Sequence, residues 1–348
     1  MTSDFDPLAD LLATLDLEEL GTARITVEGV GGRAGDHAGD SGGPGNVGDR
    51  GNVAGEPGEP GSTDSDDSGA TDLGESGATV FLGRSQRMPH GRVFGGQVLA
   101  QCVMAAGRTV ADVDDGDGPR HIHSLHGYFM RPGDDTKPIR FAVERMRDGN
   151  SFSTRRVHAL QNGLPILSMI ASFQEAAGGL DHQDSMPQVP GPDELPSLAD
   201  QFGTIDDPRA MHLLQRPVEL RHVEGSLFVD PAPDHVARQS VWMKAVGSLP
   251  DDPLVHAAVL AYASDYTLLE SVLRRHGLVW ADRRLRTASL DHAMWFHHPA
   301  RVDEWILYSQ ESPFASGGRG LGIGRMFSAH GRLVATVAQE GMMRVKES

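Results

Sequence analysis

The chain has 348 residues, with 48 acidic residues against 31 Lys and Arg, a net charge of −17 and a single cysteine. This surplus of acid argues against nucleic acid as the main partner, because phosphate binding needs clusters of Lys and Arg. One cysteine cannot form an internal disulfide, and no apolar stretch approaches the roughly 18–20 residues that span a bilayer, so we expect a cytoplasmic protein without a transmembrane segment.

Residues 1–25 predict a short helix followed by a strand. Apolar residues recur there at the spacing of an amphipathic helix: Phe5, Leu8, Leu11, Leu12 and Leu15. Residues 26–79 differ from the rest, because they hold eleven acidic residues against two Arg, many Gly, one Leu and no aromatic residue. Such a segment cannot bury enough apolar area to offset the entropy lost on ordering. We therefore expect residues 26–79 to be a disordered, acidic, Gly-rich insertion.

After the insertion, residues 80–178 are expected to form one unit. Residues 78–85 alternate like a strand, and residues 95–110 are apolar on every side, which predicts a buried helix. The Asn162-Gly163 pair is a strong signal for a hairpin turn. Further strands are predicted at residues 123–130, 137–149, 152–161 and 164–174.

The pattern then restarts. Residues 179–215 are rich in Pro and Asp and are expected to be a linker with one helix. A second unit covers residues 216–348, and residues 251–277 within it predict one long apolar helix. Its strands are predicted at residues 217–223, 239–247, 288–297, 304–314, 318–331 and 332–343.

Short matches indicate that the two units are copies of one another. A Ser-Leu pair at residues 124–125 recurs at 289–290, and a Gln-Glu pair at 174–175 recurs at 339–340, both at a separation of 165 residues. Each copy would then consist of one or two strands, a buried helix and three or four antiparallel strands. The predicted fold is therefore α+β, with two tandem antiparallel sheets each wrapped around a central helix, which is a double hotdog.

Several kinds of chemistry lack their motifs. The sequence has no G-x-S-x-G elbow and no P-loop. The glycines of residues 317–324 lack the context of a dinucleotide site, which favours glycines within a strand. His121 and His123 have no third ligand at a suitable spacing, and Cys102 lies in an apolar helix, as a core thiol does. We therefore expect no metal ion and no cofactor.

Asp265 is the residue that most strongly indicates chemistry. Its neighbours at helical spacing are apolar, or aromatic in one case: Ala261, Tyr262, Leu268 and Leu269. A carboxylate in such a position is costly unless it is paired or used, and burial raises its pKa towards the range of a general base. The alternative is that Asp265 caps a broken helix or accepts a nearby backbone amide.

Seven motifs together resemble the acyl-CoA thioesterase II family, in both units. They are RVFGGQVLAQ, HSLHGYFMRPGD, RDGNSFSTRRVHALQNG, GSLPDDPLVH, AYASD, ASLDHAMWFH and VAQEGMMR. The resemblance implies a double hotdog fold and hydrolysis of fatty acyl-CoA thioesters. It also implies a catalytic trio: Asp265 in AYASD, the hydroxyl of Ser289 in ASLDH, where many members carry Thr, and Gln339 in VAQEG.

These residue types fit the hydrolysis of a thioester. Asp265 can accept the proton of a water that Ser289 and Gln339 orient, so that no covalent intermediate is needed. We expect Gly95 and Gly96, which open the first buried helix, to supply backbone amides for the oxyanion. Tight packing of that helix against its sheet is the other explanation of these two glycines.

Two other functions stay open. An enoyl-CoA hydratase of the hotdog class needs an Asp and a His around one helix start, and the sequence near Asp265 supplies no His. A non-catalytic acyl-CoA binding protein would not need the trio. Acyl-CoA is the predicted partner, and the resemblance together with the open edge strands favours a homodimer or a higher homo-oligomer.

Overall fold

The computed structural model describes residues 5–23, 77–111, 118–203, 208–228, 230–231 and 233–346. The insertion expected at residues 26–79 lies outside this part of the chain, apart from its last three positions. Strand β2 already begins at Ala78, so the predicted end of the insertion is two residues too late.

The described helices follow the apolar patterns with one exception. Helix α1 (Pro7–Leu15) and helix α2 (Gly95–Ala111) confirm the predicted helices, although Phe5 lies before α1 and is exposed. The single helix predicted over residues 251–277 is wrong, because the chain forms two helices there. These are α5 (Pro253–Ser264) and α6 (Glu270–Arg275). The linker, for which one helix was expected, contains three short helices: η1 (Pro192–Glu194), α3 (Leu198–Phe202) and α4 (Pro208–Leu214). None of the described helices is long and apolar enough to cross a membrane.

The described strands form one continuous antiparallel sheet. Their bounds are β1 (Glu18–Ala23), β2 (Ala78–Gly83), β3 (His121–Phe129), β4 (Ile139–Asp148), β5 (Phe152–Gln161), β6 (Leu164–Gln174), β7 (Val218–His222), β8 (Arg238–Ala245), β9 (Leu285–Ser289), β10 (Asp291–Phe296), β11 (Ile306–Ser316), β12 (Arg319–Ser328) and β13 (Leu333–Val345). The strand predicted over residues 288–297 is therefore divided at Leu290, whose amide donates to the carbonyl of Glu340.

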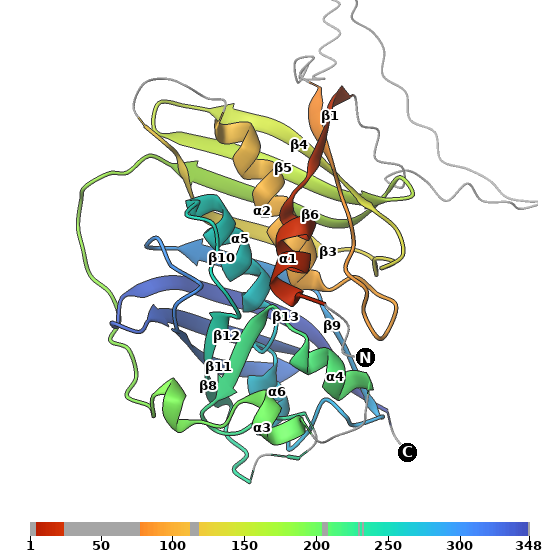
Figure 1. Cartoon of the computed structure of the whole chain (residues 1–348), viewed down its shortest axis with the longest axis vertical. Coiled ribbons are helices and arrows are strands. Elements are labelled where there is room, and N and C mark those ends of the chain that lie inside the picture. Colours follow the sequence, from red (N-terminus) through yellow and green to blue (C-terminus); the bar gives the residue numbers. More distant parts are fainter. Residues whose placement is uncertain are drawn as a thin grey trace, which may run out of the picture.

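The order of strands is the same in each half of the sheet. It runs β1-β2-β4-β5-β6-β3 and continues as β10-β13-β12-β11-β8-β7, with β9 paired to β13 (Figure 1). In each half a strand leads into the helical segment, and the next strand lies at the centre of the sheet. The following three strands fill the sheet from its outer side towards the centre: β4, β5 and β6 in the first half, and β11, β12 and β13 in the second. The two halves meet where β3 pairs with β10.

Helices α2 and α5 pack against one another in opposite directions. A Cβ on Gly96 would meet the carbonyl of Tyr262, and a Cβ on Gly107 would meet the side chain of Leu254. The start of α2 therefore lies beside the end of α5, near the middle of the molecule (Figure 1). Helix α2 packs on β4, β5 and β6, and α6 packs on β8, β11 and β12.

Two predictions about glycine are confirmed. Asn162 and Gly163 have φ values of 51° and 78° and form the two-residue turn between β5 and β6, as expected for an Asn-Gly hairpin. The glycines of residues 317–324 belong to β12 and the turn before it. A Cβ on Gly322 would lie 2.7 Å from the carbonyl oxygen of Leu268, so this glycine lets the chain after α5 approach the sheet.

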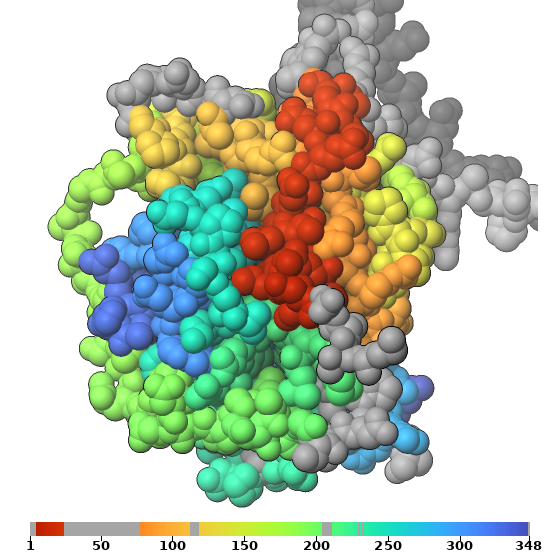
Figure 2. Space-filling model, in the orientation of Figure 1, coloured from red at the N-terminus to blue at the C-terminus, as the bar shows by residue number. Residues whose placement is uncertain are grey.

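Helix α1 bridges the two halves. It packs against α2. A Cβ on Gly247 of the second half would lie 2.9 Å from the Leu8 side chain of α1. Figure 2 shows the segment from α1 to β1 lying across the surface between the residues of the two halves. Leu11 is fully buried in this position, which explains the apolar stripe of the opening helix.

Candidate active site

Asp265 lies at the C-cap of α5, where the predicted long helix breaks. Residues 265–269 form turns before α6 begins. Buried side-chain amides from the sheet hold these turns: Gln310 donates to Thr267 Oγ1 (2.6 Å), and Gln239 donates to the Thr267 carbonyl (3.2 Å). The chain leaves the helix here because partners on distant strands satisfy the exposed backbone and hydroxyl groups.

The three residues of the expected trio meet at this break. Gln339 on β13 donates from Nε2 to Asp265 Oδ1 and to Ser289 Oγ, both at 2.7 Å. Ser289 at the end of β9 lies 3.4 Å from the same carboxylate oxygen and donates to it weakly. Gln339 is buried, whereas Asp265 and Ser289 are half-buried. Three elements that are distant in sequence thus form one hydrogen-bonded group that stays open on one side.

The surroundings of Asp265 adjust its acidity. Burial raises the pKa of its carboxyl to about 6, against hydrogen bonds from Gln339, the Gly96 amide and Ser289 that lower it. At neutral pH the carboxyl is thus mostly ionised, but its pKa lies close enough to 7 for it to accept and release a proton. This is the range in which a carboxylate works as a general base.

The two glycines that open α2 approach this carboxylate closely. A Cβ on Gly95 would lie 2.7 Å from Asp265 Oδ2, and the nearby backbone amide of Gly96 lowers the pKa of the Asp265 carboxyl. Gly96 also packs against the Tyr262 carbonyl, so close packing is one reason for this glycine. The positive end of the α2 dipole therefore faces a carboxylate. The oxyanion role expected for Gly95 and Gly96 stays a prediction.

Two further polar residues of the ASLDHAMWFH motif lie behind the trio. His292 is fully buried, and its Nε2 lies 2.9 Å from Ser264 Oγ. Asp291 accepts the backbone amide of Glu340 (2.7 Å), which is a structural contact. Sequence reasoning did not select His292. The alternation of this strand, in which Met294 is also buried, was the available signal for its inward direction.

The remaining residues considered for chemistry lie elsewhere. His121 is exposed, and His123 packs edge-on against Phe152. No group of three or more His, Cys, Asp or Glu residues in the described chain could hold a metal ion. Cys102 is fully buried within α2, and burial raises the pKa of its thiol, so it is a core thiol.

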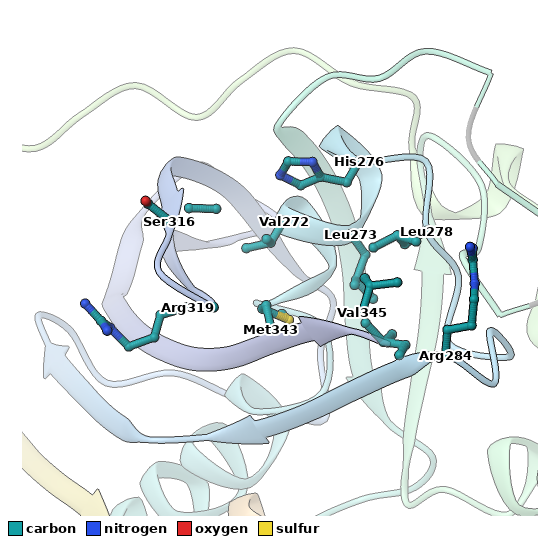
Figure 3. Close-up of a pocket in the computed structure, with 12 residues that line it drawn as sticks. Val272, Leu273, His276, Leu278, Arg284, Ser316, Arg319, Met343 and Val345 are labelled. Carbon is teal, nitrogen blue, oxygen red and sulfur yellow. The ribbon is translucent and has the colours of Figure 1, made fainter. Parts of the chain in front are cut away.

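A pocket of about 420 Å³ opens along the face of the sheet that carries Gln339. Gln339 and Met343 alternate onto the same face of β13, roughly 13 Å apart at about 3.3 Å per residue. The lining is mostly apolar: Val272, Leu273, His276, Leu278, Arg284, Leu285, Ala315, Ser316, Gly318, Arg319, Met343 and Val345. Figure 3 shows Arg319 and Arg284 on opposite sides of the apolar residues.

Known proteins share this architecture and sequence. The family profile described as acyl-CoA thioesterase matches residues 215–342, and that of the acyl-CoA thioesterase N-terminal domain matches residues 84–174. Acyl-coenzyme A thioesterase 8 of Homo sapiens is 40% identical over 283 residues, which cover 77% of this chain and 85% of that protein.

Solved structures agree. The acyl-CoA thioesterase II of Mycobacterium marinum is 45% identical, with a TM-score of 0.62 over 77% of this chain and 94% of that one. A hot dog fold protein from Alicyclobacillus acidocaldarius is 20% identical, with the same TM-score over 77% and 94% of the two chains, and shows the fold alone. The chain therefore has a hot dog fold and belongs to the acyl-CoA thioesterase family.

Proposed function

We propose that this protein hydrolyses fatty acyl-CoA thioesters to a free fatty acid and CoA, with a water molecule activated by Asp265. The observation that carries this mechanism is the meeting of Asp265, Ser289 and Gln339 at the start of α2. A half-buried carboxylate with a raised pKa and two neighbouring polar side chains is suited to hold and deprotonate one water.

The reaction needs no covalent intermediate. The water oxygen adds to the thioester carbonyl carbon while its proton passes to Asp265. Ser289 and Gln339 orient the water, and amides at the first turn of α2, with Gly95 and Gly96 as the candidates, stabilise the oxyanion. The C–S bond then breaks, and the proton on Asp265 passes to the departing CoA sulfur, which restores the carboxylate.

The pocket next to α6 fits the acyl chain. It lies on the same face as Gln339, and its interior consists of aliphatic side chains such as Val272, Leu273 and Met343. Apolar burial of this kind stabilises a bound chain by about 0.8 kcal/mol per methylene. We therefore expect medium- to long-chain substrates.

We further propose that the chain is a double hotdog with one working site. The two halves of the sheet have the same strand order, and each contributes a helical segment against it. At the repeat separation of 165 residues, Ala100 of α2 corresponds to Asp265, and α2 contains no Asp or Glu. The first half therefore lacks a base at that position.

The hydratase alternative is weakened by the position of His292. This residue lies near the trio, but it is fully buried and its Nε2 faces Ser264, so it does not face a substrate. A test measures thiol release from acyl-CoA esters of increasing length, beside hydration of crotonyl-CoA. Thiol release that Asp265→Asn abolishes supports the proposal. Hydration without thiol release would establish the hydratase, and binding without either reaction would establish the acyl-CoA binding protein.

A homo-oligomer stays a proposal, and one surface supports it. Tyr128, Ile170 and Trp295 are exposed on neighbouring strands β3, β6 and β10, where the two halves join. Exposed apolar side chains gathered on one sheet face are typical of an interface. We expect light scattering to show an oligomer that Trp295→Glu weakens, and a monomeric wild-type protein would refute this. The cytoplasmic location expected from the single cysteine also stays a prediction.

A further inference from the structure

His292 lies directly beside Gln339 in the sheet. Ala293 of β10 is paired with Ala338 of β13, so one step along this register places His292 opposite Gln339. Side chains of such cross-strand neighbours lie on the same face, with Cβ atoms about 4.5–5.5 Å apart. His292 is completely buried, so its side chain contacts protein groups and not bulk water.

A chain of contacts leads from His292 back to the base. Its Nε2 lies 2.9 Å from the hydroxyl of Ser264, the residue that immediately precedes Asp265. Gln339 in turn donates to Asp265 Oδ1. The contacts therefore form a closed loop of four residues: Asp265, Gln339, His292 and Ser264. The peptide bond between Ser264 and Asp265 completes this loop.

Two buried atoms on these side chains have no hydrogen-bond partner in the described structure, namely Gln339 Oε1 and His292 Nδ1. The other polar atom of each side chain is hydrogen-bonded: Nε2 of His292 to Ser264, and Nε2 of Gln339 to Asp265. Buried polar atoms without partners are rare and costly, so two on neighbouring side chains indicate a pair that closes. Burial lowers the pKa of His292 to about 4, and an interaction with Gln339 opposes this shift.

We propose that His292 is a positioning residue, whose neutral ring donates from Nδ1 to Gln339 Oε1 and so fixes the orientation of the Gln339 amide. This inference rests on the proposed function of the trio. The two ends of a Gln amide have similar size and opposite polarity, so packing alone does not choose between them. With Oε1 held by His292, Nε2 faces Asp265 and Ser289, as the structure has it.

The reaction itself requires such an anchor. While Asp265 is ionised, its charge attracts Nε2 of Gln339, but this attraction is lost once Asp265 has taken the proton of the water. His292 does not take part in that proton transfer, because its ring stays neutral at working pH. It therefore holds Gln339 throughout the cycle.

The groups around the imidazole of His292 are consistent with this role. Asp265 lies beyond Gln339, and Tyr308 of β11 donates to the Ser264 carbonyl (3.2 Å). Strand β3 presents Gly127 opposite His292, which adds no charge. The Ser264 hydroxyl lies within hydrogen-bond distance of both the Ala261 carbonyl (2.8 Å) and His292 Nε2, so it can donate to the ring.

The tautomer can be measured without any activity assay. Nitrogen NMR of the histidine-labelled, full-length wild-type protein should show His292 neutral with its proton on Nδ1 near pH 7. His292→Asn identifies the signal, because that resonance disappears. A proton on Nε2, or a charged ring, would overturn the proposal even if the enzyme hydrolyses acyl-CoA as described.

Kinetics supplies the second test. His292→Leu removes the donor and should lower kcat at least about tenfold with KM little changed, because the water is held less well. His292→Asn keeps an N–H near the position of Nδ1 and should retain most of kcat. In a Gln339→Ala background, His292→Leu should have no further effect on kcat.

These outcomes separate positioning from a structural role and from failure of the trio. Equal losses of kcat with and without Gln339 would mean that His292 acts on the fold, and an unchanged kcat in His292→Leu would mean that it does not act. If His292→Leu does not fold, the Asn variant and the NMR measurement decide the matter. Full activity of Gln339→Ala would instead refute the proposed role of Gln339 in the trio, while leaving the tautomer as an independent result.

Discussion

Replacing Asp265 with Asn should move activity and stability in opposite directions. Asn has the shape of Asp but cannot take a proton from water, so turnover should fall about a hundredfold to ten-thousandfold. The geometry should survive, because the amide oxygen of the introduced Asn can still accept hydrogen bonds from Gln339 and Ser289, as Asp265 does.

The magnitude of the stability gain follows from the raised pKa. Burial raises the pKa of Asp265 from 3.8 to about 6, so between these values the folded protein holds a proton that the unfolded chain has lost. Wild-type stability should therefore fall between about pH 4 and pH 6 and then level off. The total loss is at most about 3 kcal/mol at 1.36 kcal/mol per pKa unit, and solvent screening of the half-buried carboxylate reduces it. The Asn variant should escape this loss.

The assay is denaturant unfolding of both proteins at about pH 4 and about pH 8, with turnover measured on the same samples. Asp252→Asn is a matched control at the other end of α5. Asp252 caps the amide of Leu254 there, and Asn caps equally well. The reasoning fails if Asp265→Asn keeps near wild-type turnover, or if its stability relative to wild type is the same at both pH values.

Four further predictions follow from the same geometry. Ser289→Thr should keep kcat, whereas Ser289→Ala and Gln339→Ala should lower kcat more than they raise KM; unchanged kcat in both Ala variants would remove the pair from the mechanism. The kcat of the wild-type enzyme should fall as pH drops below about 6, because Asp265 is then protonated, and a profile that is flat down to pH 4 would contradict this assignment. Gly96→Ala should cost about 1–3 kcal/mol in unfolding free energy through its clash with the Tyr262 carbonyl, more than Gly107→Ala, which meets only the flexible Leu254 side chain. Met343→Trp should lower kcat/KM for the longest acyl chains alone, by about fourfold for each displaced methylene, and an equal loss at all lengths would place the acyl chain elsewhere.

The sequence predicts most elements because their apolar patterns are local. The alternation of the strands, the all-round apolar α2 and the Asn162-Gly163 turn each depend on neighbours within a few residues. The break at Asp265 does not. The apolar pattern continues from α5 into α6, and the break depends on Gln239 and Gln310, which come from strands β8 and β11. No helical periodicity contains that information.

The repeat illustrates a different limit. Ser124 lies opposite Ser172, whereas Ser289 lies opposite Gly341. In the first half, the Gln-Glu pair at residues 174–175 comes after Ser172 in the chain. In the second half, the pair at residues 339–340 comes before Gly341. The two pairs occupy different positions in the sheet, although the order of strands is the same. Register depends on bulges, which short sequence matches do not reveal.

The candidate site was predictable to the extent that motifs carry it. Asp265, Ser289 and Gln339 belong to three of the motifs that resemble the family, and the structure brings all three together. His292 lies in one of the same motifs but was missed, because its role depends on which residue of β13 faces it. Cross-strand neighbours of this kind become visible only when the register is known.

A single turnover in heavy-oxygen water tests the central claim most directly. With enzyme in excess over acyl-CoA, general-base catalysis by Asp265 predicts that the fatty acid from the first turnover carries the heavy oxygen, because that atom comes from water. The carboxyl of Asp265 should remain unlabelled when its peptide is analysed by mass spectrometry. An unlabelled fatty acid with the heavy oxygen in Asp265 would show that Asp265 attacks the thioester itself and would contradict the account.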